Sequence, residues 1–271
     1  MIHWRITSKK LREARALLKL IEYEFRKLRR RPLLILATLA SILLPVPVSI
    51  LAARTGQGYD FLYKTVINIG HFVLLIPVLC IIGALLFFEE RDNQTLRLLA
   101  IVPVSFSCLA WAKMIVLLIV SVSYSIFAYV ATVIGAALGG MPVENLYGKL
   151  FLCFVMGIMT WAAIFPCITI LVKLSKNYIF STLFSFLYAV IGFILTNATI
   201  PNQSPNLFMV LPVNVVSRWL LPVFNSLNTA KYPFDIGPSA VSTPFCVLYL
   251  IAYIVLFGTL LCKNFSKWKE I

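Results

Sequence analysis

The chain has 271 residues, of which 61% are hydrophobic and only 13% are charged, and its mean hydropathy is +0.92. A soluble domain averages about 45–50% apolar and about 25% charged residues, so this composition excludes an ordinary soluble protein. It predicts a polytopic membrane protein with little room for a soluble domain.

The net charge of +14 would indicate nucleic-acid binding in a soluble protein, but here the placement of the basic residues decides. Of the 24 lysines and arginines, 11 lie in residues 1–31, three between residues 88 and 114, two at positions 173 and 176, and three at positions 263, 267 and 269. These 19 fall on one side of the predicted spans and the other five on the opposite side. The positive-inside rule makes the basic side cytoplasmic. The excess charge then orients the chain and contacts anionic membrane lipid, and we expect no nucleic-acid partner.

Residues 1–31 lack the apolar core of a cleavable signal peptide, so we expect the first span to act as an uncleaved signal. After Ser8, apolar residues recur at helical spacing against a basic face, which predicts an amphipathic helix in the membrane interface. The apolar positions are Leu11, Leu18, Ile21, Phe25 and Leu28. This helix either only fixes the topology or also contacts a partner subunit, and the sequence leaves both interpretations open.

Six apolar stretches are long enough to cross a bilayer. They cover residues 32–53, 65–88, 113–138, 150–172, 178–196 and 243–261. The predicted fold is an all-α polytopic membrane protein with both termini in the cytoplasm. Its parts are an N-terminal interfacial helix (1–31), a six-helix transmembrane domain (32–262) and a basic tail (263–271).

Prolines and small residues predict local features of three spans. Pro45 and Pro47 predict a kink in the outer half of the first span, and Thr160 and Pro166 are candidate break points in the fourth. The third span is rich in serine, alanine and glycine, which permits close helix packing in lipid.

One histidine of the spans and six cysteines raise the question of metal chemistry. His71 could bind a proton or a metal ion, but no second histidine has ligand spacing, so we interpret it as a hydrogen-bonded residue at a helix interface. No cysteine pair has metal-ligand spacing, and five of the six lie in or beside apolar spans. We predict small buried hydrophobic side chains and no metal site.

The polar stretch between the second and third spans, residues 87–113, reads FFEERDNQTLRLLAIVPVSFSCLAWAK. It opens with four consecutive charges, Glu89 to Asp92, and changes to helical spacing after Thr95. Because a charge in lipid costs several kcal/mol, we expect the stretch to project into water between two membrane helices. We predict that it receives mechanical work from a partner protein.

The order of residues in this stretch resembles the first cytoplasmic helix of the permeases of type-two ABC exporters. The resemblance lies in the acidic residues, in Asn93-x-Thr95-Leu96-Arg97-Leu98-Leu99, in Pro103-Val104-Ser105 and in the lysine that begins the next span. In that family the helix docks on a separate ATPase subunit and transmits its closure to the spans. The chain departs from the family at Gln94, where glycine is usual, and at Phe106 and Ser107, where basic residues often follow.

The resemblance implies which residues meet the ATPase subunit. They are Glu89, Glu90, Arg91, Asp92, Thr95, Leu96, Arg97, Leu99 and Pro103. A second, smaller contact is implied for the short inner connection that carries Lys173 and Lys176.

No GxxxxGK[ST] loop occurs, so we expect no cofactor and no ATPase site in this chain, with Mg-ATP held by the partner subunit. Six spans are half of the twelve that a complete transporter usually has. The resemblance therefore implies a second copy of this permease, or a similar permease, together with a dimer of the ABC ATPase subunit. The implied location is a bacterial cytoplasmic membrane.

Residues 197–242 form a long, proline-rich and apolar outer segment. Its apolar pieces, residues 207–213 and 219–224, are interrupted by Pro212 and Pro222 and are too short to span. We interpret them as short helices that dip into the outer leaflet and present an apolar surface, with a packed outer cap as an equal alternative. The residues expected in a substrate pathway there are Leu207, Phe208, Arg218 and Trp219.

An apolar outer surface suits an amphiphile that partitions into the membrane. Small six-span permeases of this family often resemble those of lantibiotic self-immunity and bacitracin resistance. The resemblance therefore implies an amphiphilic peptide antibiotic as the substrate. Export of another lipid, a drug or a polysaccharide is the alternative within the same class.

Two other classes are less well supported. Glu89-Glu90 is similar to the start of the EExxxR motif of intramembrane proteases, but Gln94 stands where the arginine is due and no histidine follows in the later spans. An ion-coupled carrier normally has acidic groups at the bilayer midplane. Here the acidic residues lie at span ends or in loops, so we expect no buried ion pair.

Overall fold

The computed structural model describes residues 17–29, 31–92, 105–174, 177–202, 210–228 and 240–270, and the regular elements in these ranges are all helical. Six helices in them are long and apolar enough to cross a membrane. They are Leu34–Thr55, Tyr59–Glu90, Phe106–Leu138, Leu146–Leu174, Tyr178–Ala198 and Thr243–Ser266. The predicted all-α fold with six spans is confirmed.

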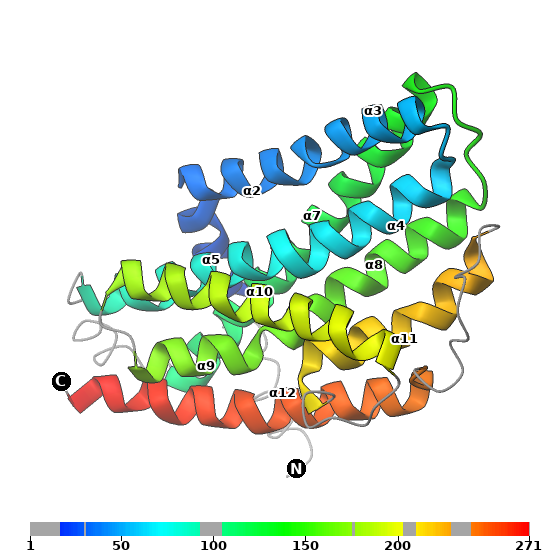
Figure 1. Ribbon diagram of the computed structural model, residues 1–271. Helices are drawn as coiled ribbons and strands as arrows, with labels where there is room; N and C mark the ends of the chain where they lie inside the picture. Colours follow the sequence, from blue (N-terminus) through cyan, green and yellow to red (C-terminus); the bar gives the residue numbers. More distant parts are fainter. Residues whose placement is uncertain are drawn as a thin grey trace, which may run out of the picture.

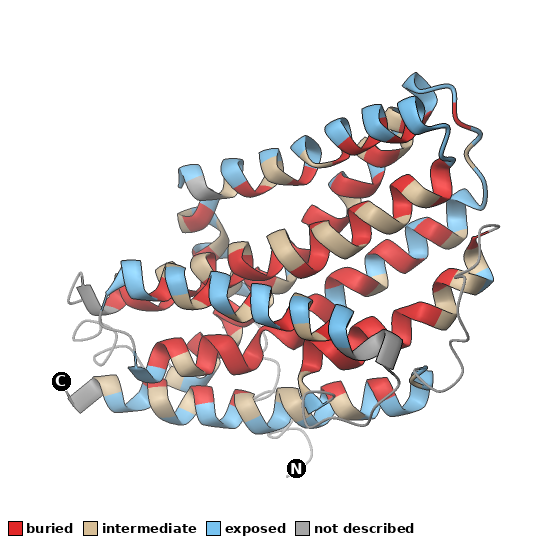
Figure 2. Cartoon of the chain, in the orientation of Figure 1, coloured by how far each residue is buried: buried red, intermediate tan, exposed pale blue. Residues whose placement is uncertain are grey.

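The six spans differ in how deeply they lie in the bundle (Figure 1). The second and fourth spans are central, with 72% and 78% of their most apolar windows buried. The first, fifth and sixth spans are peripheral, with 28%, 28% and 22% buried. Their outer faces contain many exposed residues (pale blue in Figure 2), including large apolar ones. Lipid tails are as apolar as leucine, so such faces are stable in a bilayer.

Prolines interrupt the first two spans. The first span divides into α2 (Pro32–Leu43) and α3 (Pro45–Thr55), and the division falls directly before Pro45, where a kink was predicted. The second span contains α4 (Tyr59–Ile69), a π-helical turn (Gly70–Leu75) and α5 (Ile76–Asp92). The wide turn directly precedes Pro77, whose ring would clash with the carbonyl four residues earlier in a regular α-helix.

The fourth span also divides, into α8 (Leu146–Ala163) and α9 (Phe165–Leu174). The break lies beside Pro166, one of the two predicted positions. Thr160, the other, lies inside α8, where its hydroxyl donates to the Met156 carbonyl (2.8 Å).

The third span, α7 (Phe106–Leu138), is an unbroken helix of 33 residues that begins earlier than the predicted residue 113. It packs closely on α8, because Ser121 Oγ donates to the Gly157 carbonyl (2.7 Å). A Cβ at Gly157 would lie 2.9 Å from Ser125 Oγ, so a larger residue does not fit without a shift. The close packing predicted from the small residues of this span is confirmed.

The last part of the chain differs most from the prediction. α10 (Tyr178–Asn202) continues past residue 196, and α11 (Pro212–Leu227) is one helix with Pro222 inside it. The expectation of short pieces broken at Pro222 is therefore wrong. α11 packs against α8, α10 and α12 (Thr243–Ser266). This packing outweighs the roughly 3 kcal/mol that an interior proline costs.

Both ends of the described chain lie at one end of the bundle, which we call the terminal end. Residues 17–29 reach the start of α7 through Glu24, and the Trp268 ring lies 5.9 Å from the Phe88 ring at the end of α5. We call the other end of the bundle the opposite end (Figure 1). The helices α3 and α7 end there, and α4 and α8 begin there.

Residues 17–29 are helical, which confirms this part of the predicted helix. Leu28 is buried in the protein, and Ile21 and Phe25 are half-buried. Leu18 is 66% exposed because it lies about 120° around the helix from the buried Glu24, and its placement in the membrane interface stays a prediction. The rest of the predicted helix, including Leu11, lies outside the described residues.

Candidate functional site

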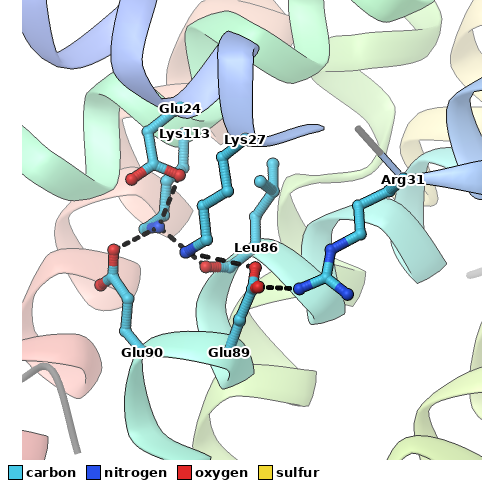
Figure 3. Close-up of polar contacts among 7 residues, drawn as sticks. All are labelled: Glu24, Lys27, Arg31, Leu86, Glu89, Glu90 and Lys113. Carbon is cyan, nitrogen blue, oxygen red and sulfur yellow. Dashed lines mark hydrogen bonds and ion pairs between the residues drawn. The ribbon is translucent and has the colours of Figure 1, made fainter. Parts of the chain in front are cut away.

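Lys113, in the first turns of α7, is fully buried at the terminal end. Its Nζ donates to Glu24 Oε2 (3.0 Å), to Glu90 Oε1 (2.8 Å) and to the Leu86 carbonyl oxygen (2.8 Å). Figure 3 shows these acceptors around the ammonium group. A lysine ammonium has three N–H donors, so each of them has an acceptor.

The two carboxylates are buried with the lysine. The exposed fractions of the Glu24 and Glu90 side chains are 1% and 5%. Desolvating each ion costs several kcal/mol, which close pairing and hydrogen bonding must offset. Removing one partner of such a pair typically costs about 3–5 kcal/mol, because a buried charge remains without compensation.

A second set of ion pairs adjoins Lys113. Glu89 forms an ion pair with Lys27 Nζ at 3.2 Å and accepts a hydrogen bond from Arg31 Nη2, and its side chain is 16% exposed (Figure 3). Three cations and three carboxylates thus balance in one group, which we call the terminal ion cluster. Its members are Glu24, Lys27, Arg31, Glu89, Glu90 and Lys113.

The terminal ion cluster joins the two helices that flank residues 93–104. Glu89 and Glu90 lie near the end of α5, which leads into that segment, and Lys113 lies near the start of α7, which leads out of it. Glu24 adds residues 17–29 to the same group. The cluster therefore ties the end of α5 to the start of α7.

The residues predicted to meet an ATPase subunit fall into three groups. Glu89 and Glu90 pair with basic groups of the chain itself, and Arg91 and Asp92 end α5. Lys173 is exposed in the last turn of α9 at the terminal end. The others, Thr95, Leu96, Arg97, Leu99, Pro103 and Lys176, lie outside the described residues.

The expectation that the whole stretch 87–113 projects into water is wrong at its two ends. Phe87, Glu90 and Lys113 are buried, because the two charges pair with each other inside the protein.

The expectation of no buried ion pair is also wrong at the opposite end. Lys149 of α8 is fully buried, and its Nζ donates to Asp60 Oδ1 of α4 (2.7 Å). The same Nζ lies 4.2 Å from the centroid of the Tyr59 ring and 5.4 Å from that of Tyr63. The Tyr63 hydroxyl donates to the Lys149 carbonyl (2.8 Å), so side chain and backbone of one residue both bind α4. We call Asp60 and Lys149 the opposite-end ion pair.

Sequence reasoning missed both lysines because their partners are distant. Glu24 precedes Lys113 by 89 residues, and Asp60 precedes Lys149 by the same interval. One signal was present: Glu24 interrupts the apolar face formed by Ile21 and Leu28. An acidic residue on such a face predicts a buried basic partner, although not which one.

α11 buries the residues that were expected to face the outer leaflet. Arg218 and Trp219 are 4% and 6% exposed, and Trp219 Nε1 donates to Thr243 Oγ1 (3.0 Å). Of the two alternatives for this segment, the apolar outer surface is wrong for this helix and the packed cap agrees with the structure, because α8, α10 and α12 cover it. Leu207 and Phe208 lie outside the described residues.

His71 is buried in the π-helical turn, and its Nε2 lies 3.0 Å from Ser125 Oγ of α7. The predicted hydrogen-bonded residue at a helix interface is confirmed. Four of the six cysteines are buried as predicted, and the other two are half-buried: Cys80, Cys153, Cys167 and Cys246, then Cys108 and Cys262.

Six spans with charged groups gathered at the two ends define a multi-pass membrane protein. The family model of the ABC-2 family transporter proteins matches residues 20–192, which is more than half of the chain and includes both buried lysines with their partners. The chain belongs to this family. A comparison with curated proteins yields no match.

Membership of the family makes the chain the membrane component of an ABC exporter and not itself an ATPase, and it implies an ABC ATPase subunit as partner. Both buried ion pairs lie at the ends of the spans and not at the midplane, where an ion-coupled carrier has its acidic groups, and the family match also argues against a carrier.

Proposed function

We propose that this chain is the permease of an ATP-driven exporter in which residues 87–113 dock on a separate ATPase subunit and the terminal ion cluster passes the movement of that subunit to the spans. One observation carries the proposal. The Lys113 ammonium binds Glu90 and the Leu86 carbonyl of α5, and also Glu24 of residues 17–29. The distribution of basic residues supports a cytoplasmic terminal end, which is where such a subunit would dock.

Movement begins when the ATPase subunits close on ATP and displace the docked segment. α5 and α7 move together because Lys113 holds them, and residues 17–29 follow through Glu24. α7 has 33 residues without a break and is therefore about 50 Å long, so it carries the displacement to the opposite end. The permease exchanges between an inward-open and an outward-open state. ATP shifts this equilibrium only if the closed ATPase dimer binds one of the two states more tightly than the other. A second copy of this chain, or a similar permease, completes the pathway.

The proposed substrate is an amphiphilic peptide antibiotic, such as a lantibiotic or bacitracin, moved out of the membrane or cell to give resistance or self-immunity. The resemblance described above supports this class. An apolar groove of about 550 Å³ between the first span and α7 also supports it, since Arg54 is the one charged residue among the described residues that line it. Apolar walls suit a molecule that enters from lipid, whereas a polysaccharide would leave its polar groups without partners there. A lipid or a drug fits the same groove and is the alternative.

Co-purification tests the partner. The tagged chain is co-expressed with a candidate ABC ATPase subunit, and ATP hydrolysis is measured in the purified complex. We expect Asp92→Lys and Leu99→Pro to lose the ATPase subunit while the chain still inserts, and Glu22→Gln, an exposed acidic residue of the N-terminal helix, to retain it. Equal recovery of the subunit with all three variants would contradict docking on residues 87–113.

Growth inhibition across lantibiotics, bacitracin and unrelated soluble drugs tests the substrate. Cells with the complex are expected to tolerate more of at least one peptide, and Val130→Trp, which fills the groove, is expected to abolish the gain. Val247→Trp is the matched control, because Val130 and Val247 are 45% and 41% exposed and Val247 lies on α12, outside the groove. No shift for any peptide, with the protein present and the ATPase active, would remove the peptide assignment and leave the family standing.

A further inference from the structure

A basic pocket opens at the terminal end, beside the helix formed by residues 17–29. It is a hollow of about 480 Å³ lined by Tyr23, Arg26, Lys27 and Arg31. The Arg26 side chain is 75% exposed and that of Arg31 is 54% exposed, so the pocket is accessible from outside. Among the described residues, its lining holds three cations and no acidic side chain.

We propose that this pocket binds the phosphate of an anionic phospholipid headgroup, such as that of phosphatidylglycerol. The charges support an anion of this size. Glu22 pairs with Arg26, and Glu89 pairs with both Lys27 and Arg31, so two carboxylates meet three cations. Neither carboxylate is among the described residues that line the hollow, so the lining presents basic groups to a phosphodiester.

The cations also have hydrogen-bond donors to spare. A guanidinium carries five N–H donors and an ammonium three. Arg31 contacts Glu89 through Nη2, and Lys27 contacts it through one ion pair, so further N–H groups on both side chains can point into the pocket. Two N–H donors on one guanidinium match two oxygens of a phosphate.

The position of the pocket favours a lipid over a soluble anion. Arg31 precedes the first residue of the first span, Leu34, by three residues, which is about 5 Å along a helix. Phosphate groups lie at this level, directly above the hydrocarbon layer. Tyr23 adds an aromatic side chain of the kind enriched at the membrane–water interface.

A lipid bound in the pocket would contact the terminal ion cluster directly, because Lys27 and Arg31 belong to both. A bound phosphate holds residues 17–29 at the membrane surface, in the position where Glu24 meets Lys113. The lipid site requires no ATPase and no transport. Its test therefore succeeds or fails independently of the function proposed above.

The experiment uses the purified full-length chain in a neutral detergent. Short-chain phosphatidylglycerol, phosphatidylcholine and inorganic phosphate are titrated separately, and the bound molecules are counted by native mass spectrometry. We expect phosphatidylglycerol to bind in preference to phosphatidylcholine. Since each basic residue near an anionic membrane surface contributes a similar increment, Arg26→Gln should weaken phosphatidylglycerol about fivefold and Arg26→Gln/Arg31→Gln about thirtyfold. Lys263→Gln, at an exposed lysine of the same end, should leave it unchanged.

Three results would overturn the proposal. The first is equal binding of phosphatidylglycerol and phosphatidylcholine, or a preference for phosphatidylglycerol that remains in both Arg26→Gln and Arg26→Gln/Arg31→Gln. The second is displacement of the lipid by inorganic phosphate at equal concentration, which would make this a site for a free anion. The third is that Arg26→Gln loses a co-expressed ATPase subunit but keeps its lipid, which would make the pocket a protein-docking surface. Arg26 pairs with the exposed Glu22, so an unchanged thermal midpoint should show that this variant is folded.

Discussion

Lys113 at the terminal end and Lys149 at the opposite end are both fully buried, but their surroundings differ. Lys113 is held by three hydrogen bonds, two of them to carboxylates from separate elements. Lys149 has one carboxylate, Asp60, and the rings of Tyr59 and Tyr63 lie over the rest of its ammonium group. Hydrogen bonds require a narrow range of distance and angle, whereas attraction to a ring face depends more weakly on position. We therefore expect the terminal end to move as one unit and the opposite end to be the place where helices separate.

The largest effect is expected from Lys113→Met. It leaves Glu24 and Glu90 buried without their cation, so the free energy of unfolding should fall by about 3–5 kcal/mol. Thermal unfolding in detergent, followed by size-exclusion chromatography, measures the change. Adding Glu24→Gln and Glu90→Gln gives a neutral triple variant that should recover most of the loss. A single variant as stable as the unchanged chain would show that the charges are not held as described.

A smaller loss, about 2 kcal/mol, is expected from Lys149→Met. The Asp60 side chain that it leaves behind is 10% exposed and can therefore reach water more easily than Glu24. The same unfolding measurement applies, with Lys149→Met/Asp60→Asn as the compensated control. A greater loss than that of Lys113→Met would reverse the comparison between the two ends.

A loss of about 1 kcal/mol or less is expected from Glu89→Gln, because its pairs with Lys27 and Arg31 are partly open to water. Glu22→Gln removes a more exposed pair, whose side chains are 61% and 75% exposed, from residues 17–29 and should change stability by less still. Equal losses for the two variants would place Glu89 outside the terminal ion cluster.

Single cysteine substitutions can report which side of the membrane each end of the bundle faces, and we expect them to leave stability unchanged. In a cysteine-free background, an impermeant maleimide added to intact cells should label Leu138→Cys at the opposite end and should not label Ser266→Cys at the terminal end. Labelling of residue 266 from outside would reverse the proposed orientation of the two ends.

Local sequence predicted the spans and their breaks well, because both depend on neighbouring residues. Apolar length defines a span, and Pro45 and Pro166 mark breaks that the structure contains. Features that depend on distant partners were not predictable. Each buried lysine pairs across 89 residues, and Pro222 stays inside a helix because three other helices cover it.

The candidate site was predicted in outline only. The stretch 87–113 was recognised from its charges and its resemblance to a known helix, both of which are local properties. The inward pairing of Glu90 with Lys113 was not, since an acidic residue beside a span looks the same whether it faces water or a buried cation. Glu24 was the one local sign of the pairing, because it lies on an otherwise apolar helix face.

Transmission of ATPase movement through the terminal ion cluster can be measured at the far end of α7. A cysteine at position 138, in a cysteine-free complex with the ATPase subunit, is labelled with and without ATP. With the cluster intact, ATP should change the labelling rate. In the neutral triple variant (Glu24→Gln, Glu90→Gln, Lys113→Met), the ATPase subunit should still co-purify and hydrolyse ATP, but ATP should no longer change the rate. The same ATP-dependent change in both proteins would contradict a role of the cluster in transmission.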